Sequence, residues 1–118
     1  MIGASVSGGF SNQITATRES PNKTRALAYV LKKVWPRKQV ALVNKASVML
    51  YMNPPKLGAK QVQDARVHDP SLVIAVDFVF WFGCGPGGRE ARFRRQQLCF
   101  EMLDKLSCPI LLGDYPDM

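Results

Sequence analysis

The chain has 118 residues, of which 47% are hydrophobic and 21% charged, a composition that excludes a disordered chain and suits one globular domain. The formal net charge of +7 suits an anionic partner, but the basic residues are scattered, so we expect no specific nucleic-acid binding. The longest apolar run, residues 72–83, is short and contains Asp77, so we expect no membrane span.

The first third of the chain reads as strand, helix and strand. Residues 2–6 form a short apolar strand that leads into a polar loop. A helix begins at Ser20-Pro21, a capping hydroxyl followed by proline, and its apolar residues Leu27, Val30, Leu31 and Val34 share one face before Pro36 ends it. Residues 39–43 form the second predicted strand.

The rest of the chain continues the alternation of helices and strands. A weaker helix begins at Asn53-Pro54-Pro55 and contains Gly58, which is unfavourable in a helix. Residues 72–80 are apolar on both faces, as in a central parallel strand. After a glycine-rich turn, a long helix covers residues 89–106 and a fourth strand covers residues 108–112.

This order of elements predicts an α/β fold, because alternating strands and helices build a parallel sheet with helices on both faces. We expect a single domain over residues 1–118, a three-layer sandwich with a flavodoxin-like sheet of about four strands in the order 2-1-3-4.

Ligands of such sheets bind at the carboxyl ends of the strands. Polar residues follow each predicted strand and should gather at that edge: Ser5 and Ser7, then 44–47, then 77–81, then 114–117. Serine, asparagine and aspartate together predict a nucleophile with an oxyanion site.

Two segments resemble blocks of the SGNH (GDSL-type) serine hydrolases. Residues 3–9, Gly-Ala-Ser-Val-Ser-Gly-Gly, are similar to the G-D-S-x-[ST]-x-G block, with Ala4 at the usual aspartate. Residues 43–47, Val-Asn-Lys-Ala-Ser, are similar to the N-x-G-x-S block, with Ala46 at the glycine. The resemblance implies that Ser5 is the nucleophile of an esterase, lipase or acylhydrolase, and that the amides of Ser5 and Ala46, with Asn44, form the oxyanion hole.

The later blocks of the family depart from this pattern. Residues 77–81 stand where the G-x-N-D block would follow the third strand, but they contain no asparagine. No D-x-x-H block is present, since residues 114–117 have its spacing but end in aspartate. The only histidine, His68, lies four residues after Asp64 and before the third predicted strand, at the opposite edge, which predicts a turn residue. The chain therefore looks like the first two-thirds of such a domain and is either a hydrolase with an incomplete site or a non-catalytic relic.

Four further residues are candidates for the substrate pocket besides Ser7. Asp77 is either an acid oriented at the edge or a buried acid bonded to nearby backbone. Phe80 and Trp81 are core residues or a pocket wall, and a Trp81 at the edge would suit an acyl or aromatic group. Asp114 follows the fourth predicted strand.

A rival function is phosphate or nucleotide binding by the glycine-rich turn 83–88 and Arg89, placed between a strand and a helix. The turn matches neither common phosphate-binding motif, and a mobile loop is the simpler interpretation. The arginines in the following helix form a solvated face or an anion site.

The three cysteines have no C-x-x-C spacing, which favours free thiols over a disulfide framework or a zinc site. With no signal peptide evident, we expect a cytoplasmic protein. We expect a small ester or acyl substrate, no cofactor and no metal.

Overall fold

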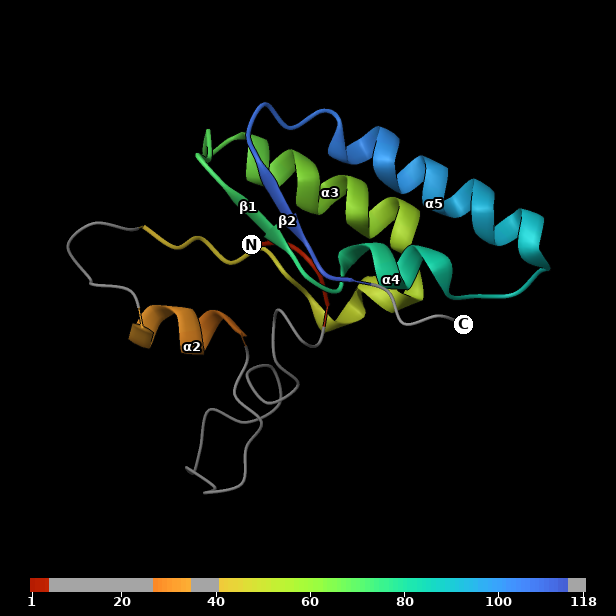
Figure 1. Ribbon diagram of the computed structural model, residues 1–118, viewed down its shortest axis with the longest axis horizontal. Coiled ribbons are helices and arrows are strands. Elements are labelled where there is room, and N and C mark those ends of the chain that lie inside the picture. Colours follow the sequence, from red (N-terminus) through yellow and green to blue (C-terminus); the bar gives the residue numbers. More distant parts are fainter. Residues whose placement is uncertain (5–26, 35–40, 115–118) are drawn as a thin grey trace, which may run out of the picture.

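A computed structural model describes residues 1–4, 27–34 and 41–114 of the chain (Figure 1). In chain order the elements are α2 (Leu27–Val34), the short 3-10 helix η1 (Val48–Met52), α3 (Pro54–Arg66), β1 (Val73–Ala75), α4 (Phe78–Gly83), α5 (Arg89–Leu103) and β2 (Ile110–Leu112). None of the helices in these ranges combines the length and apolar character needed to cross a membrane.

The sheet of the described residues has two parallel strands, with Val73 opposite Ile110 and Ala75 opposite Leu112. The prediction of a three-layer, flavodoxin-like sandwich with about four strands is therefore wrong. The fourth predicted strand is shorter than expected, Ile110–Leu112 in place of 108–112. Residues 41–43, the described part of the second predicted strand, belong to no strand.

The first four residues lie beside β1 without forming a regular strand. The amide of Ile2 donates to the carbonyl of Ile74 over 3.0 Å. On the other side, the amides of Lys45 and Ser47 donate to the carbonyls of Met1 and Gly3 over 2.8 and 2.9 Å. Segment 1–4 thus lies between β1 and the residues that follow Val43, held by a few isolated backbone bonds.

The third predicted strand, residues 72–80, divides into two elements. Only Val73–Ala75 is strand, and Phe78–Gly83 forms the short helix α4, in which four of the six residues are buried. A run that is apolar on every side has neither a period of two nor one of 3.6, so its pattern does not separate a buried strand from a buried helix. For this reason residues 78–80, predicted to be strand, are instead the first residues of a helix.

The two longest helices, α3 and α5, agree with their predicted bounds more closely than the strands do. Asn53 caps α3 by accepting a bond from the Lys56 amide, and prolines occupy the first two helical positions, where no amide is needed. Helix α5 begins at Arg89 as predicted and ends at Leu103, three residues earlier than expected.

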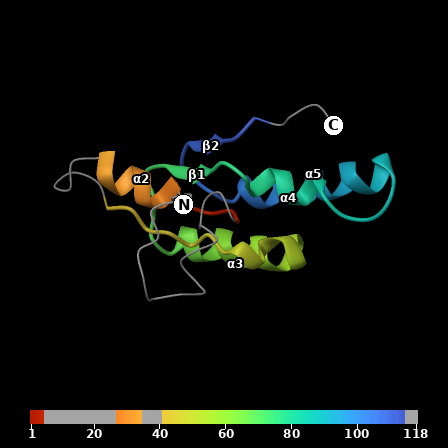
Figure 2. The ribbon, with the colours of Figure 1, turned by 90° about the horizontal axis from the view of Figure 1, so that it is seen from below.

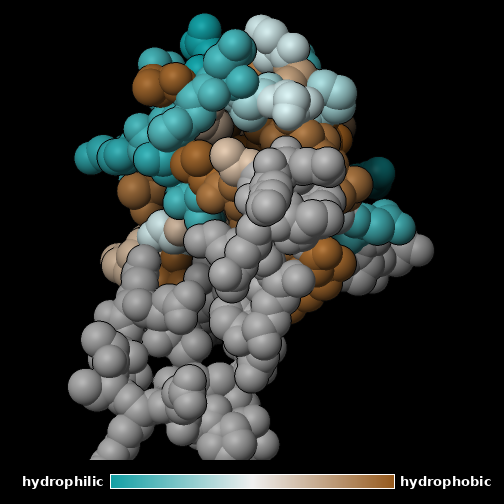
Figure 3. All heavy atoms as spheres, turned by 90° about the vertical axis from the view of Figure 1, so that its left-hand side faces the viewer, coloured by the Kyte–Doolittle hydropathy of each residue, from teal (hydrophilic) through white to brown (hydrophobic). Residues whose placement is uncertain are grey.

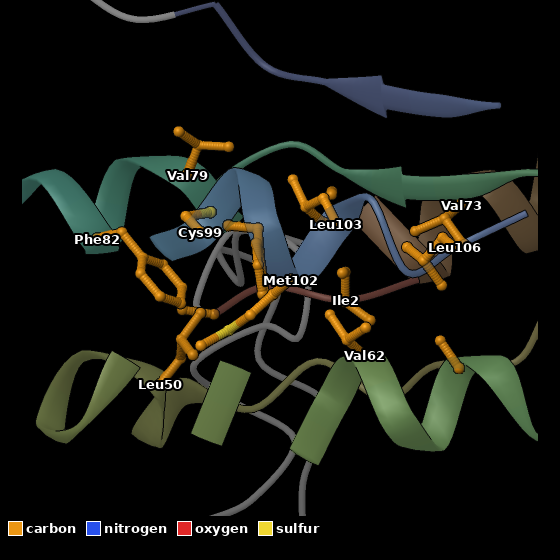
Figure 4. Packing of buried hydrophobic residues seen from close by; sticks show 14 residues of the cluster. Ile2, Leu50, Val62, Val73, Val79, Phe82, Cys99, Met102, Leu103 and Leu106 are labelled. Atoms are coloured by element: carbon orange, nitrogen blue, oxygen red, sulfur yellow. The ribbon is translucent and has the colours of Figure 1, made fainter. Parts of the chain in front are cut away.

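The main core lies between β1, segment 1–4, α3, α4 and α5 (Figure 4). Figure 4 shows Met102 of α5 reaching toward Leu50, while Ile2 of the first segment faces Val62 of α3. Figure 2 shows α3 and β2 at opposite sides of the molecule, with β1 and the N-terminal segment between them. Segment 1–4 is therefore part of the hydrophobic core.

A second, smaller cluster attaches α2. Met1 and Ile74 are buried in it, with Leu27 and Leu31 of α2 packed against them. Val30 and Val34, predicted to share this inward face, are 42% and 75% exposed. Helix α2 therefore contacts the core through a narrower stripe than its periodicity predicts.

Candidate functional site

Gln61 holds the N-terminal segment from α3. Its Oε1 accepts a hydrogen bond from the Gly3 amide over 2.7 Å, and its Nε2 donates to the Gly3 carbonyl over 3.0 Å. The side-chain amide, only 5% exposed, thereby replaces the backbone partner that a neighbouring strand would supply. Gly3 has a φ of 133°, a conformation that favours glycine.

Asp77 holds the next residue. Its Oδ1 accepts a bond from the Ala4 amide over 3.0 Å, and the side chain is buried. Asp77 lies two residues beyond β1, at the strand's carboxyl end. Of the two roles predicted for Asp77, an acid oriented at the edge or a buried acid bonded to backbone, the structure shows the buried acid. Its bond holds Ala4, the residue immediately before Ser5.

The loop over residues 44–47 lies against the same segment. The Ser47 amide donates to the Gly3 carbonyl, and the Ser47 hydroxyl caps η1 by accepting from the Met49 amide over 3.3 Å. The Ala46 amide donates to the Asn44 Oδ1 over 3.0 Å. In this conformation the Ala46 amide, a predicted oxyanion donor, already bonds to Asn44. To bind an oxyanion, the amide would have to give up that bond.

The predicted site residues divide into two groups. Asn44, Ala46 and Asp77 lie around segment 1–4, although residues 41–43 do not form the strand that was expected to bring Asn44 and Ala46 to a sheet edge. Asp114 is exposed, and it follows Gly113, at which an added Cβ would lie 2.1 Å from the Val76 carbonyl oxygen. The predicted nucleophile Ser5 and its neighbour Ser7 lie outside the described residues.

Phe80 and Trp81 belong to an aromatic group that joins α4 to η1. The two rings meet edge to face with their centroids 5.1 Å apart, and the Tyr51 ring lies 6.0 Å from that of Trp81. The Trp81 indole nitrogen is buried, and no described residue bonds to it. Helix η1 follows loop 44–47, and helix α4 follows Asp77. The aromatic group therefore joins the element after loop 44–47 to the element after Asp77.

Gln61 and Tyr51 were missed by sequence reasoning. A glutamine at a helical position on a mostly polar helix carries no signal of burial, and only the i, i+3, i+4 spacing of buried Gly58, Gln61 and Val62 places it on the inner face. Tyr51 lies in η1, a helix for which the sequence predicted no element.

His68 lies at the other end of β1, as predicted. It is exposed, in the turn after α3, and its amide donates to the Ala65 carbonyl. The Asp64 carboxylate pairs with Lys60 over 2.8 Å, and this bond lowers the pKa of Asp64. Figure 3 views this side of the molecule, where hydrophilic residues gather over the upper part. No His68–Asp64 catalytic pair is formed.

The glycine-rich turn follows helix α4, so the prediction that it links a strand to a helix is wrong. Arg95 organises the turn, because its guanidinium donates to the carbonyls of Phe82 and Pro86 over 3.2 and 2.9 Å. Arg94 pairs with Glu90 over 2.5 Å on the exposed surface. These contacts give two of the four arginines structural partners within the chain.

Comparison with family models, curated proteins and solved structures found no match for the chain. The SGNH resemblance accordingly stays a prediction from its two motifs. Within residues 1–4, 27–34 and 41–114, no three histidine, cysteine or acidic side chains are grouped to hold a metal ion.

Proposed function

We propose that the edge formed by segment 1–4, loop 44–47 and Asp77 is an ester or acyl hydrolase site of SGNH type, with Ser5 as the nucleophile. The observation that carries this proposal is the bond from the Ala4 amide to the buried Asp77. Ser5 is the next residue in the sequence, so the residue that precedes the proposed nucleophile is held at the carboxyl end of β1. A nucleophile needs such a fixed backbone, because attack requires alignment within a fraction of an ångström.

Each neighbouring group has a role in this site. Gln61 and Asp77 are positioning residues that hold the backbone before Ser5. The amides of Ser5 and Ala46 would stabilise the negative charge that develops on the substrate carbonyl oxygen. The Ala46 amide, which now bonds to Asn44, would exchange that oxygen for the substrate's. The aromatic group around Trp81 offers an apolar surface for an acyl chain.

The site has no general base of the family's kind. The sequence contains one histidine, and it lies at the amino end of β1. A serine hydroxyl without a base is a weak nucleophile, so we expect slow turnover and only of esters with a good leaving group.

Ser5→Ala is expected to reduce hydrolysis of p-nitrophenyl acetate to the rate of buffer alone, because the attacking oxygen is removed. The release of p-nitrophenol is followed by absorbance for the unaltered chain, for Ser5→Ala and for a Ser71→Ala control, which alters an exposed serine before β1. The unaltered chain and the control should release p-nitrophenol faster than buffer at similar rates. In parallel, a fluorophosphonate probe should attach to Ser5, located by peptide mass spectrometry.

Two results would contradict the hydrolase. One is equal ester hydrolysis by the unaltered chain and Ser5→Ala. The other is an unaltered chain that neither exceeds the buffer rate nor reacts with the probe at Ser5. Circular dichroism of each variant confirms that a loss of rate is not a loss of fold.

We infer that the chain works in a reducing compartment such as the cytoplasm, because its three cysteines form no disulfide with one another. Cys99 is buried in the main core, and burial raises the pKa of its thiol to about 12. Cys84 and Cys108 are half-buried.

The cysteines should therefore differ in reactivity. In the folded chain at mildly alkaline pH, iodoacetamide is expected to modify Cys84 and Cys108 but not Cys99, whose thiol stays protonated below its raised pKa and is shielded from the reagent. In concentrated guanidinium chloride all three should react. Peptide mass spectrometry distinguishes the sites, and rapid labelling of Cys99 in the folded chain would refute its burial.

A further inference from the structure

Helix α5 presents an outer face that carries two exposed aromatic side chains and one half-buried glutamine, Gln96. Phe93 is 66% and Phe100 is 47% exposed, and neither belongs to the main core. At 100° per residue they lie on one stripe with four polar residues, and we call this stripe the α5 face: Arg89, Phe93, Gln96, Gln97, Phe100 and Asp104. Two large exposed aromatic side chains on one stripe of a helix supply apolar surface that a partner can bury.

The charges at the two ends of the α5 face are unfavourable for an isolated helix, because each has the same sign as the helix dipole at that end. Arg89 stands at the positive N-terminal end of α5, and Asp104 at the negative C-terminal end, so each is disfavoured by the helix dipole. Neither forms an ion pair within the described part of the chain. Beside a second α5 running in the opposite direction, both charges would meet the opposite end of that helix and be favoured.

The spacing of the face is symmetric about its centre, between Gln96 and Gln97. Phe93 and Phe100 lie at equal distances from this point, and so do Arg89 and Asp104. In a two-fold symmetric dimer, every contact occurs twice: if residue i of one copy contacts residue j of the other, residue j of the first copy contacts residue i of the second. An antiparallel pair of α5 helices would therefore place Phe93 against Phe100 and Arg89 against Asp104, each twice.

We propose that the α5 face binds a second copy of this chain, forming a two-fold symmetric homodimer through antiparallel α5 helices. Helix α5 has 15 residues and is about 22 Å long, which gives a small interface and a weak dimer. The aromatic pairs supply the buried apolar area, and the charged pairs set the antiparallel register. The face shares no residue with the edge formed by segment 1–4, loop 44–47 and Asp77, so the dimer does not depend on hydrolysis.

The test is a charge exchange measured by sedimentation equilibrium over a wide range of chain concentrations. The unaltered chain should show a monomer–dimer equilibrium. Arg89→Asp and Asp104→Arg alone should each raise the dissociation constant by about tenfold or more, because each places like charges together twice. The double variant, in which the charges are exchanged, should recover most of the dimer.

Phe93→Lys should also abolish the dimer. Its matched control is Val67→Lys, which alters an apolar side chain that is 75% exposed but lies after α3, and should leave the dimer unchanged. Circular dichroism verifies folding of each variant. A chain that stays monomeric at all concentrations overturns the proposal, as does a dimer indifferent to all four α5 variants or one that the charge exchange does not restore. Retention of labelled single-stranded oligonucleotide by a monomer, lost in Phe93→Lys, would overturn it and assign the face to nucleic acid.

Discussion

Gln61→Leu is expected to lower the free energy of unfolding by about 2 kcal/mol, because it leaves the buried Gly3 amide without a partner and removes one of the two bonds to the Gly3 carbonyl. Leucine has nearly the same size, so the loss reflects hydrogen bonding more than volume. Urea denaturation followed by circular dichroism measures the change.

The matched control is Gln63→Leu on the same helix. Gln63 is exposed, so removal of its amide leaves no buried group unsatisfied, and stability should change little. Equal stabilities for the two variants would show that the Gln61–Gly3 contact does not hold the N-terminal segment. If the hydrolase proposal is right, Gln61→Leu should also reduce labelling of Ser5 by the fluorophosphonate probe.

Gly58→Val is expected to destabilise the chain by about 2 kcal/mol, even though valine is a better helix former than glycine. A Cβ at position 58 would lie 2.7 Å from the Phe82 Cζ and 3.1 Å from the Phe78 Cζ. Both rings are buried with no exposed surface, so neither can move aside without disturbing the core. Thermal or urea denaturation measures the effect.

A second substitution tests the cause. Adding Phe82→Leu to Gly58→Val removes the ring atoms nearest the new side chain, so the double variant should be more stable than the sum of the two single changes predicts. Ala59→Val, at the exposed neighbouring position, is the control and should cost about 0.5 kcal/mol or less. Strict additivity of the two changes would refute the contact between α3 and α4.

Local signals in the sequence predicted the parts of the fold that depend on local chemistry. The Asn53 cap with its two prolines placed the start of α3, and the glycine turn placed the start of α5 at Arg89. The reason for Gly58 within α3 was not visible, because it depends on a ring that lies 24 positions further along the chain.

The sheet and the site were less predictable. Apolar residues 78–82 fit a strand and a buried helix equally well, and only their packing selects the helix. Asp77 lies just beyond β1, but Asn44 follows no strand, so the predicted order of the elements did not place it. The bond between Asn44 and the Ala46 amide is a detail of one loop. Gln61 carried no signal because glutamine is usually exposed.

The position of segment 1–4 has a consequence for how the chain folds. Its hydrogen-bond partners are separated from it by 42 residues at Val43, 58 at Gln61 and 73 at Asp77. Contacts this distant in sequence close large loops, and they slow folding. During synthesis residues 1–4 leave the ribosome before all of these partners, and Asp77 follows only after four of the seven described elements have been made. The segment that precedes Ser5 is therefore expected to be among the last to acquire its native contacts.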